Sequence, residues 1–442
     1  MVQGSISTRF RTPLRRVALA LSVIASHAAR AQSPPSTSSL IDSLRGRVGL
    51  TTQDAWTVLG RRGLPLVEPT ANDSEHCVVT FVWRGDSTTR NVVLVTPLTL
   101  VDFTSSIMMR LGQTDLWYRS VTLPTDARFA YRFAPNDNLV PFEQDTNIFA
   151  RFATMRQDPA NSKVFDYGAF GHLSILELPR APNDSLIRRH PNRETGVVTR
   201  GVIASHALGH ERVVWVYTPA RDMRTRPTRY GLVIFSDGES YQSQIPTPVI
   251  LDNMIADGMI PPVVAVFVET PSATREPDLS CNARWSTFVA TELVPWMDAH
   301  YLVTRDPRGR VIAGYSLGGL AAACAAVQYP ATIGNVIAQS GSFFRAPDGE
   351  PPEALARQLA GRPRRPINFS LSIGRYETAA IPSRDPSMLT ASRHLRDVLI
   401  AKGYAVIYRE FSSGHEPVAW RATLGRALQD LLSPGPRITS DR

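Results

Sequence analysis

The second half of the chain alternates short apolar runs with helical segments, and this alternation limits the possible folds more than any other feature. The apolar runs cover residues 213–217, 232–235, 263–268, 311–313, 336–338, 369–373 and 405–408. Helical segments lie between them, at 287–299, 317–328 and 387–401. Apolar strands alternating with helices indicate a mainly parallel sheet covered by helices on both faces. We therefore expect a doubly wound α/β domain over residues 213–434.

The first half of the chain is rich in β-branched and aromatic runs separated by Gly, Asp, Asn and Pro. These runs cover 78–83, 91–95, 116–121 and 129–133, after a short helix expected at 54–62. The pattern predicts a β-sandwich of immunoglobulin-like size over residues 46–178. A stretch without sustained periodicity follows, and we place the interdomain linker there, at 179–212. A tail covers 435–442.

The N-terminus predicts export from the cell. Four arginines between positions 9 and 16 precede an apolar run over 17–29, and Ala-Arg-Ala follows at 29–31. A basic start, an apolar stretch too short to span a bilayer and small residues at the cleavage positions are typical of a signal peptide, here residues 1–31. The mature chain then begins at Gln32, with a leader over 32–45, in the periplasm or outside the cell. The alternative is an uncleaved anchor, because Arg30 is unusual at a cleavage site.

The formal net charge of +9 does not indicate a nucleic-acid partner, because part of it lies in the predicted signal peptide. Five arginines belong to residues 1–31, so 43 basic and 39 acidic residues remain and the mature chain carries +4. No dense basic run interleaved with aromatic residues occurs, and we expect no nucleic acid to bind. No segment after the signal peptide is long and apolar enough to cross a membrane.

Three cysteines permit at most one disulfide bond, in an oxidising compartment. Cys324 lies in an Ala-rich helical segment, and its simplest interpretation is a small core residue. No C-x-x-C or H-E-x-x-H motif occurs, and the closest pair of histidines, His206 and His210, falls in the predicted linker. We expect neither a metal nor an organic cofactor.

One motif in the second half predicts covalent chemistry. The strand at 311–313 runs into G-Y-S-L-G at 314–318, and an Ala-rich helix follows. Between a strand and a helix, G-x-S-x-G is the nucleophile elbow of α/β-hydrolases, a strained turn in which side chains at both glycine positions would collide with backbone. Ser316 is the predicted nucleophile, and the Leu317 amide would face an oxyanion. The alternative is a tight turn with an inert serine.

A serine nucleophile needs a base, because its hydroxyl is barely ionised at neutral pH. Only His394 and His415 follow Ser316, on the side that the Ser, acid, His order of this fold requires. His394 lies in the middle of a helical segment, which favours a surface position. His415 lies in a loop after a strand and directly follows a glycine. His415 is therefore the predicted base.

The third member of the triad orients the histidine, and we expect it after the strand that ends near 373. Glu377 is preferred because it is nearer the strand, while Asp385 fits the start of a helix. A Ser-His dyad without a firm acid stays open. A second oxyanion donor is expected after the strand at 232–235, from the N–H of Gly238 or Glu239, unless this segment is an ordinary Asp-Gly turn.

With these residues placed, the chain resembles the enterochelin (enterobactin) esterase family, within the broader putative esterase group of α/β-hydrolases. The resemblance covers both halves of the chain. It rests on the elbow, on Gly414-His415 and on F-S-D-G at 235–238, R-E-P-D-L-S-C-N at 275–282, E-L-V-P at 292–295, Q-S-G-S at 339–342, P-L-V-E-P at 65–69, V-T-F-V-W-R at 79–84 and D-L-W-Y at 115–118.

The resemblance implies an α/β-hydrolase domain preceded by a β-sandwich domain. It also implies a small-molecule substrate, because the family hydrolyses the ester bonds of a cyclic catecholate trilactone after uptake of the ferric siderophore. Iron would belong to the substrate and not to the protein. Catalytic roles follow for Ser316 and His415, and Glu377 matches less firmly.

The resemblance assigns Arg275, Asn282, Trp285 and Tyr315 to the substrate cleft. Two of these residues have a structural alternative, because Asn282 could cap the helix that follows it and Trp285 could pack beneath that helix.

The predicted export signal departs from the family, which includes cytoplasmic two-domain enzymes, and it leaves the substrate open. An exported carbohydrate esterase that removes feruloyl or acetyl groups, or a general carboxylesterase, is the first alternative, because one catalytic scaffold serves many esters. The second alternative is an exported ligand-binding protein that retains the fold without catalysis.

Overall fold

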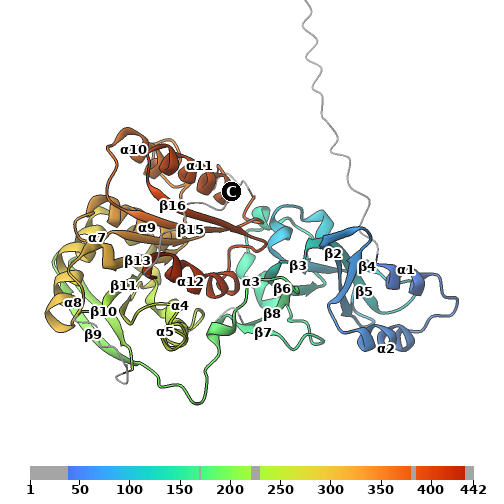
Figure 1. The fold of residues 1–442 in the computed structure, drawn as a ribbon. Coiled ribbons are helices and arrows are strands. Elements are labelled where there is room, and N and C mark those ends of the chain that lie inside the picture. The colour runs from blue at the N-terminus through green and yellow to red at the C-terminus, as the bar shows by residue number, and fades with distance from the viewer. Residues whose placement is uncertain (1–37, 169–170, 221–228, 380–384, 434–442) are drawn as a thin grey trace, which may run out of the picture.

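We describe the fold from a computed structural model of the chain. The structure describes residues 38–168, 171–220, 229–379 and 385–433. The predicted signal peptide at 1–31, the first part of the predicted leader and the predicted tail at 435–442 lie outside these residues. Two domains lie side by side, the N-terminal domain in blue to teal and the C-terminal domain in green to red (Figure 1).

The N-terminal domain contains two antiparallel sheets of four described strands each, ordered β1-β2-β5-β4 and β3-β6-β8-β7. Its helices and strands are α1 (Ser39–Arg45), α2 (Thr52–Arg62), β1 (Leu66–Thr70), β2 (Asp73–Arg84), β3 (Val92–Val95), β4 (Met109–Arg110), β5 (Leu116–Pro124), β6 (Arg128–Pro135), α3 (Ile148–Thr154), β7 (Val164–Asp166) and β8 (His172–Glu177). The four strands predicted for this half correspond to β2, β3, β5 and β6, with β3 beginning one residue later than predicted, and the predicted helix lies within α2.

The two sheets share one hydrophobic core, because alternate residues of a strand point to the same side of its sheet. Val79 and Phe81 of β2 point into this core, as do Phe129, Tyr131 and Phe133 of β6. The rings of Phe81 and Tyr131 meet edge to face, with their centroids 4.8 Å apart. The alternating bulky residues in the sequence therefore form the buried faces of the two sheets.

Part of the predicted leader belongs to the N-terminal domain. Within the leader predicted at 32–45, residues 39–45 form helix α1, which is capped by the Ser38 side chain. The helix buries Ile41 and Leu44 in a cluster with residues of α2 and β5. The leader prediction is therefore wrong for these residues. The leader begins with Ser and Pro residues, but Ile41 and Leu44 after them are spaced to lie on one face of a helix, and this face packs into the domain.

The C-terminal domain is built on an eight-stranded sheet with the order β16-β15-β14-β13-β11-β12-β10-β9. Its helices and strands are β9 (Val197–Ser205), β10 (His210–Thr218), β11 (Gly231–Phe235), α4 (Gly238–Gln242), α5 (Thr247–Ala256), β12 (Val263–Val268), α6 (Ser272–Leu279), α7 (Ala283–Thr287), α8 (Val294–His300), β13 (Arg310–Tyr315), α9 (Leu317–Gln328), β14 (Asn335–Gln339), α10 (Ala354–Gly361), β15 (Asn368–Gly374), α11 (Met388–Ala401), β16 (Ala405–Phe411) and α12 (Pro417–Leu432). All seven predicted strands are present. The helix predicted at 287–299 is divided, because a π-helical segment (Phe288–Leu293) separates α7 from α8.

The linker predicted at 179–212 contains a strand of this sheet. β9 pairs antiparallel with β10, from Val197 opposite Thr218 to Ser205 opposite His210. β9 is the edge strand, and most of its side chains are exposed. An edge strand of this kind lacks the continuous apolar run that identified the buried strands, which is why the prediction for 197–205 was wrong.

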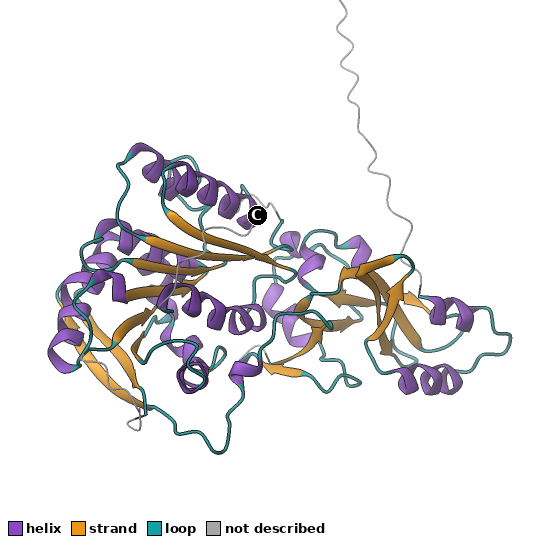
Figure 2. Cartoon of the chain, in the orientation of Figure 1, coloured by secondary structure: helices purple, strands orange, loops and turns teal. Residues whose placement is uncertain are grey.

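Helices cover both faces of the sheet, as expected (Figure 2). Alternate residues of β11 separate the two faces: Leu232 and Ile234 belong to one core cluster, and Val233 and Phe235 belong to the other. The first cluster receives α8, α9, α10 and α11, and the second receives α5 and α12. No described helix is long and apolar enough to cross a membrane. The parallel strands therefore end at one edge between two helical layers, which is where α/β proteins place their sites.

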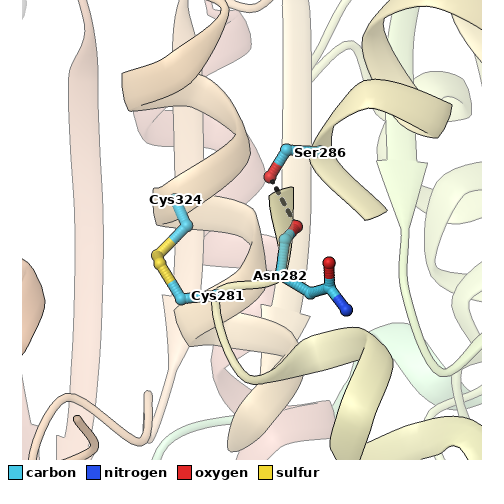
Figure 3. Close-up of a disulfide and its surroundings, with 4 residues drawn as sticks. All are labelled: Cys281, Asn282, Ser286 and Cys324. Atoms are coloured by element: carbon cyan, nitrogen blue, oxygen red, sulfur yellow. Dashed lines mark hydrogen bonds between the residues drawn. A yellow bond between two sulfur atoms is a disulfide. The ribbon is translucent and has the colours of Figure 1, made fainter. Parts of the chain in front are cut away.

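A disulfide bond joins Cys281, in the turn after α6, to Cys324 on α9 (Figure 3). Their Cα atoms are 5.5 Å apart, and 43 positions separate them in the sequence. Cys324 is buried in the core, as expected, and it also forms the one disulfide bond that three cysteines permit. Cys77 is buried as a free thiol in the N-terminal domain. The bond fastens the α6–α7 turn to the helix that begins next to Ser316.

We expect removal of this disulfide to destabilise the protein. Closing a loop of this length reduces the entropy of the unfolded chain, and the Cys281→Ser/Cys324→Ser variant should lose about 2–4 kcal/mol of unfolding free energy. Urea unfolding of both proteins measures the difference. Wild-type protein treated with a reductant should move toward the variant, and the reductant should leave the variant unchanged. An unchanged midpoint in the double variant would contradict the prediction.

Candidate active site

The predicted elbow is a sharp turn between β13 and α9. Ser316 has φ 55° and ψ −124°, a backbone conformation that a non-glycine residue adopts at a cost of about 1–3 kcal/mol. A Cβ atom on Gly314 would lie 2.3 Å from the carbonyl of Gly318, and one on Gly318 would lie 2.7 Å from the Ser236 hydroxyl. Both glycines are therefore required by close packing, and the turn presents Ser316 at the carboxyl edge of the sheet.

The three residues of the predicted triad form one hydrogen-bonded chain. Ser316 Oγ lies 3.0 Å from His415 Nε2, and His415 Nδ1 lies 2.8 Å from Glu377 Oε2. A proton on Nδ1 donates to the carboxylate, which leaves Nε2 free to accept the hydroxyl proton. Ser316, Glu377 and His415 follow β13, β15 and β16 respectively. The arrangement is that of a nucleophile, its base and an orienting acid.

The alternative candidates for the base and the acid, His394 and Asp385, lie elsewhere. His394 is on the exposed side of α11, where its Nδ1 is 2.9 Å from Glu353 Oε1. Asp385 is exposed and precedes α11. Among the described residues, the acid that contacts His415 is Glu377.

Glu377 is held by its second carboxylate oxygen. Oε1 accepts hydrogen bonds from the Ser340 hydroxyl at 2.6 Å and from the Gly374 amide at 2.8 Å. Ser340 in turn accepts a hydrogen bond from Trp420 Nε1 at 3.0 Å. The side chain of Glu377 is buried, so these donors fix its orientation without competition from solvent.

Tyr315 and Trp420 form an aromatic stack next to the triad. Their rings lie 14° from parallel with centroids 4.2 Å apart, and the His415 ring meets Trp420 edge on at 5.0 Å. Burial raises the pKa of the Tyr315 phenol far above its ordinary value, and neighbouring Asp237 adds to the shift. The phenol is therefore neutral, and its ring packs on Trp420, which in turn contacts the catalytic histidine.

The predicted oxyanion segment packs directly against the elbow. Gly238 begins α4, and a Cβ atom there would lie 2.7 Å from the backbone of Phe267 in β12. On the other side, a Cβ atom on Gly318 would lie 3.0 Å from Asp237 Oδ2. Leu317 and Gly238 are both first residues of helices, where backbone N–H groups have no acceptor within the helix. The choice between Gly238 and Glu239 as second donor stays a prediction.

Arg275 pairs with Asp237 in that same segment. Its Nε and Nη2 donate to the two carboxylate oxygens of Asp237 at 2.7 and 2.9 Å, and its guanidinium lies 5.6 Å from the centre of the Tyr315 ring. Burial raises the pKa of Asp237, and the Arg275 charge opposes that rise. The guanidinium thus holds the β11–α4 turn in place, and this role was not predicted from the sequence.

Loss of this ion pair should destabilise the fold. We expect Arg275→Met to lower the unfolding free energy by roughly 2–4 kcal/mol, because it leaves the Asp237 carboxyl buried without its partner. Arg308 is the matched control, since it makes a similar bidentate pair with Asp306 on the exposed surface. Arg308→Met should leave the urea midpoint close to that of wild type, because solvent screens an exposed pair. Equal midpoints for both variants would refute a special role for the Arg275 pair.

Asn282 and Trp285 have structural roles. Asn282 caps α7, because its Oδ1 accepts the Arg284 amide at 2.8 Å, while its Nδ2 donates to the Pro277 carbonyl at 3.0 Å. Figure 3 shows Asn282 beside the disulfide. Trp285 is 1% exposed and packs against Phe288 in the core. The prediction that Trp285 lines the substrate cleft was wrong. For Asn282 the structural alternative, a helix cap, is observed.

A cavity of about 420 Å³ opens beside His415 at the junction of the two domains. Its walls are mostly apolar and come from both domains. Leu100, Phe149, Phe152, Phe165, Tyr167 and Leu173 belong to the N-terminal side, and Glu377, Met388, His415, Glu416 and Val418 belong to the C-terminal side. A ligand in this cavity would contact the N-terminal domain while its reacting group lies next to the histidine.

The sequence matches a family model described as putative esterase over residues 205–431, just over half of the chain. The chain belongs to this family. A second model, described as the N-terminal domain of enterochelin esterase, matches residues 78–186. The two matched ranges correspond to the two domains of the structure. The esterase is therefore a carboxylester hydrolase with an α/β-hydrolase-type catalytic domain.

The esterase is similar to proteins that share both domains. It is 28% identical to an iron(III) enterobactin esterase of Dickeya dadantii, over 86% of this chain and 92% of that protein. It is 26% identical to an iron(III) salmochelin esterase of Escherichia coli O6:H1, over 89% of this chain and 97% of that protein. Among solved structures, the ferric enterobactin esterase of Salmonella typhimurium superposes with a TM-score of 0.69 at 25% identity, over 85% and 98% of the two chains.

Two contributors to the esterase site were missed from the sequence. Ser340, which holds Glu377, lies in the Q-S-G-S segment that supported the resemblance but received no role there. Trp420 lies on α12, and its ring contacts the His415 ring although the helix was given no role in the predicted site. A strand-end serine in a motif was a usable signal for Ser340. Nothing local distinguishes Trp420 from other buried helix residues.

Proposed function

We propose that this esterase cleaves the ester bonds of a catecholate trilactone siderophore, with or without bound iron. The observation that carries the proposal is the Ser316–His415–Glu377 chain beside a cavity whose walls come from both domains. Relatives that share both domains over most of their length are named for iron(III) enterobactin and salmochelin. The second domain and the cavity support a substrate larger than a simple acyl ester.

In the proposed reaction, Ser316 Oγ attacks the ester carbonyl carbon while His415 Nε2 takes the hydroxyl proton. Glu377 stabilises the imidazolium that forms. The Leu317 amide, with Gly238 or Glu239, donates hydrogen bonds to the oxyanion of the tetrahedral intermediate. The proton on His415 then passes to the leaving alkoxide. Water, deprotonated by His415, hydrolyses the acyl enzyme and regenerates Ser316.

We propose that the two N-terminal sheets form an immunoglobulin-like β-sandwich that serves as one wall of the substrate site. The shared core of the two sheets and the aromatic side chains that this domain contributes to the cavity support this role. We retain Arg275 and Tyr315 as candidate contacts to the substrate, because both lie at the elbow and Arg275 stays partly exposed.

Product analysis tests the substrate class. Wild-type protein and Ser316→Ala are each incubated with ferric enterobactin and with feruloylated xylan, and products are separated by liquid chromatography with mass detection. We expect linear trimer, dimer and monomer of the dihydroxybenzoyl-serine unit from the siderophore, with wild-type protein only. Release of ferulate with the siderophore untouched would replace the proposal with the carbohydrate esterase function.

We also propose that the protein is exported, to the periplasm or beyond. The basic and apolar N-terminus supports a cleaved signal peptide, and the Cys281–Cys324 bond suits an oxidising compartment. Fractionation of cells that express the full chain, followed by intact mass measurement, tests the proposal. We expect a chain that begins at Gln32 outside the cytoplasm. An uncleaved chain in the cytoplasmic fraction would overturn it.

A further inference from the structure

One edge of β6 is only half occupied by its own sheet. β6 pairs with β8 through residues 128–131, and on its opposite edge it pairs with β3 through residues 132–135. Backbone N–H groups alternate between the two edges of a strand, so those of Arg128 and Ala130 point along the edge that β3 leaves open. Open strand edges in proteins are usually covered or paired.

The loop that carries His415 covers this open edge. The Arg128 N–H donates to the Ser412 carbonyl at 3.0 Å, and the Ala130 N–H donates to Glu416 Oε2 at 2.9 Å. The two acceptors flank His415 in the sequence. The N-terminal domain therefore holds the histidine loop on both sides of the histidine.

Close packing against the N-terminal domain fixes the middle of the loop, at Gly414. A Cβ atom on Gly414 would lie 2.5 Å from the ring of Pro97, which begins a short 3-10 helix (Pro97–Leu100) of the N-terminal domain. Position 414 thus has room only for glycine. Pro97 packs over the residue immediately before His415.

The side chain of Glu416 contacts β6 of the N-terminal domain and not its own helix. It occupies the capping position of α12, yet its carboxylate makes no capping hydrogen bond to that helix. Burial raises the pKa of Glu416 to about 8, with Glu377 adding to the rise and the amides of Ala130 and Gly414 opposing it. The carboxyl is therefore neutral at neutral pH, and it accepts from Ala130 without burying a charge.

We propose that β6 of the N-terminal domain is part of the catalytic apparatus, and that Glu416 is the positioning residue through which it holds His415 in register with Ser316. The proposal rests on the proposed function of the triad. The loop has other contacts, since the Tyr376 amide donates to the Ser413 carbonyl at 3.1 Å, but these come from the C-terminal domain itself. Loss of the β6 contact should let the imidazole drift, and a misplacement of about 1 Å can cost about 100-fold in rate.

The test compares Glu416→Ala with Glu416→Gln on a small activated aryl ester, with rates normalised to the fraction of protein that a fluorophosphonate titrates. We expect Glu416→Ala to lower kcat about 10- to 100-fold, with KM changed by less than about 3-fold. Glu416→Gln keeps an acceptor oxygen for the Ala130 N–H and should restore kcat to within about 3-fold of wild type. Asp126→Asn is the control, because it removes another interdomain pair, with Arg375, whose guanidinium also contacts the Ser412 hydroxyl, while it leaves the Ala130–Glu416 hydrogen bond in place.

The pH profile gives a readout that a purely structural role would not move. The charged or titratable groups near the Glu416 carboxyl are Glu377, His415, Arg421, Tyr167 and, on β6, Arg132. As pH rises through about 8, the Glu416 carboxyl ionises in a buried site. The Ala130 N–H favours the anion, but the larger desolvation cost that raises the pKa favours movement of the charged group toward water, and this movement loosens the loop. Wild-type kcat should therefore fall above that pH, and Glu416→Gln should not show this fall.

The outcomes separate this proposal from the function on which it rests. If Glu416→Ala keeps wild-type kcat while Ser316→Ala is inactive, the positioning role is wrong and the triad stands. If Glu416→Ala does not fold, the comparison of wild type with Glu416→Gln above pH 8 decides the matter. Identical profiles for those two proteins would overturn the proposal.

Discussion

Replacing Ser316 with alanine should lower the turnover of an activated aryl ester by about 10⁴- to 10⁶-fold and leave the fold intact. The variant loses the hydroxyl that lies within hydrogen-bond reach of His415 Nε2, while the strained turn accepts alanine in place of serine. Initial rates measure the loss. A fluorophosphonate should add to the wild-type chain at Ser316, seen by intact mass and peptide mapping, and should not add to the variant.

Ser342 provides the matched control for this experiment. Its hydroxyl lies 3.4 Å from Ser316 Oγ, so it is the serine that a reagent could reach by mistake. Ser342→Ala should stay within about 10-fold of wild-type turnover and keep full labelling. Labelling that follows Ser342, or turnover that survives in Ser316→Ala, would remove Ser316 as nucleophile.

Replacing Glu377 with glutamine should lower kcat by about 10³- to 10⁴-fold, with the fold retained. An amide has one acceptor end and one donor end, whereas the carboxylate accepts on both sides. Whichever way the introduced amide turned, its NH₂ group would face either His415 Nδ1–H or the donors from Ser340 and Gly374. The imidazole would then lose the partner that fixes its tautomer and stabilises its positive charge.

Asp385 tests the specificity of that result. It is the other acid that the sequence allows, and it is exposed and remote from the hydrogen bonds of His415. Asp385→Asn should keep kcat within about 2-fold of wild type. The assignment of Glu377 fails if the two variants lose activity equally, or if Glu377→Gln stays as active as wild type after correction for folded protein.

The catalytic residues were predictable because each carries a local signal. The turn at Ser316 needs glycines on both sides, and His415 and Glu377 each follow an apolar strand, so chain order and strand ends were enough to select them. The bounds of helix α9 were predicted to the residue, at 317–328, because a run of small apolar residues directly follows the elbow and ends at Gln328. These elements are determined by short-range sequence patterns.

The remaining features depend on contacts between distant segments. Strand β9 is exposed at the sheet edge, so its side chains carry no buried pattern. Trp285 was expected in a cleft, and its burial follows from the helices around it and not from its neighbours in sequence. Cys281 meets Cys324 because α6 ends against α9. None of these distances can be read from spacing along the chain.

The cavity at the domain junction has a consequence for how such an enzyme diversifies. The atoms that break the ester are encoded near the carboxyl ends of three strands, whereas more than half of the residues that line the cavity are encoded between positions 95 and 173, in the other domain. Apart from Pro97 and the β6 residues that hold the histidine loop, substitutions among these residues can alter which ester is accepted without moving the bond-breaking atoms. Selection for a new substrate should therefore accumulate in the N-terminal half, while the chemistry of the C-terminal half is inherited unchanged.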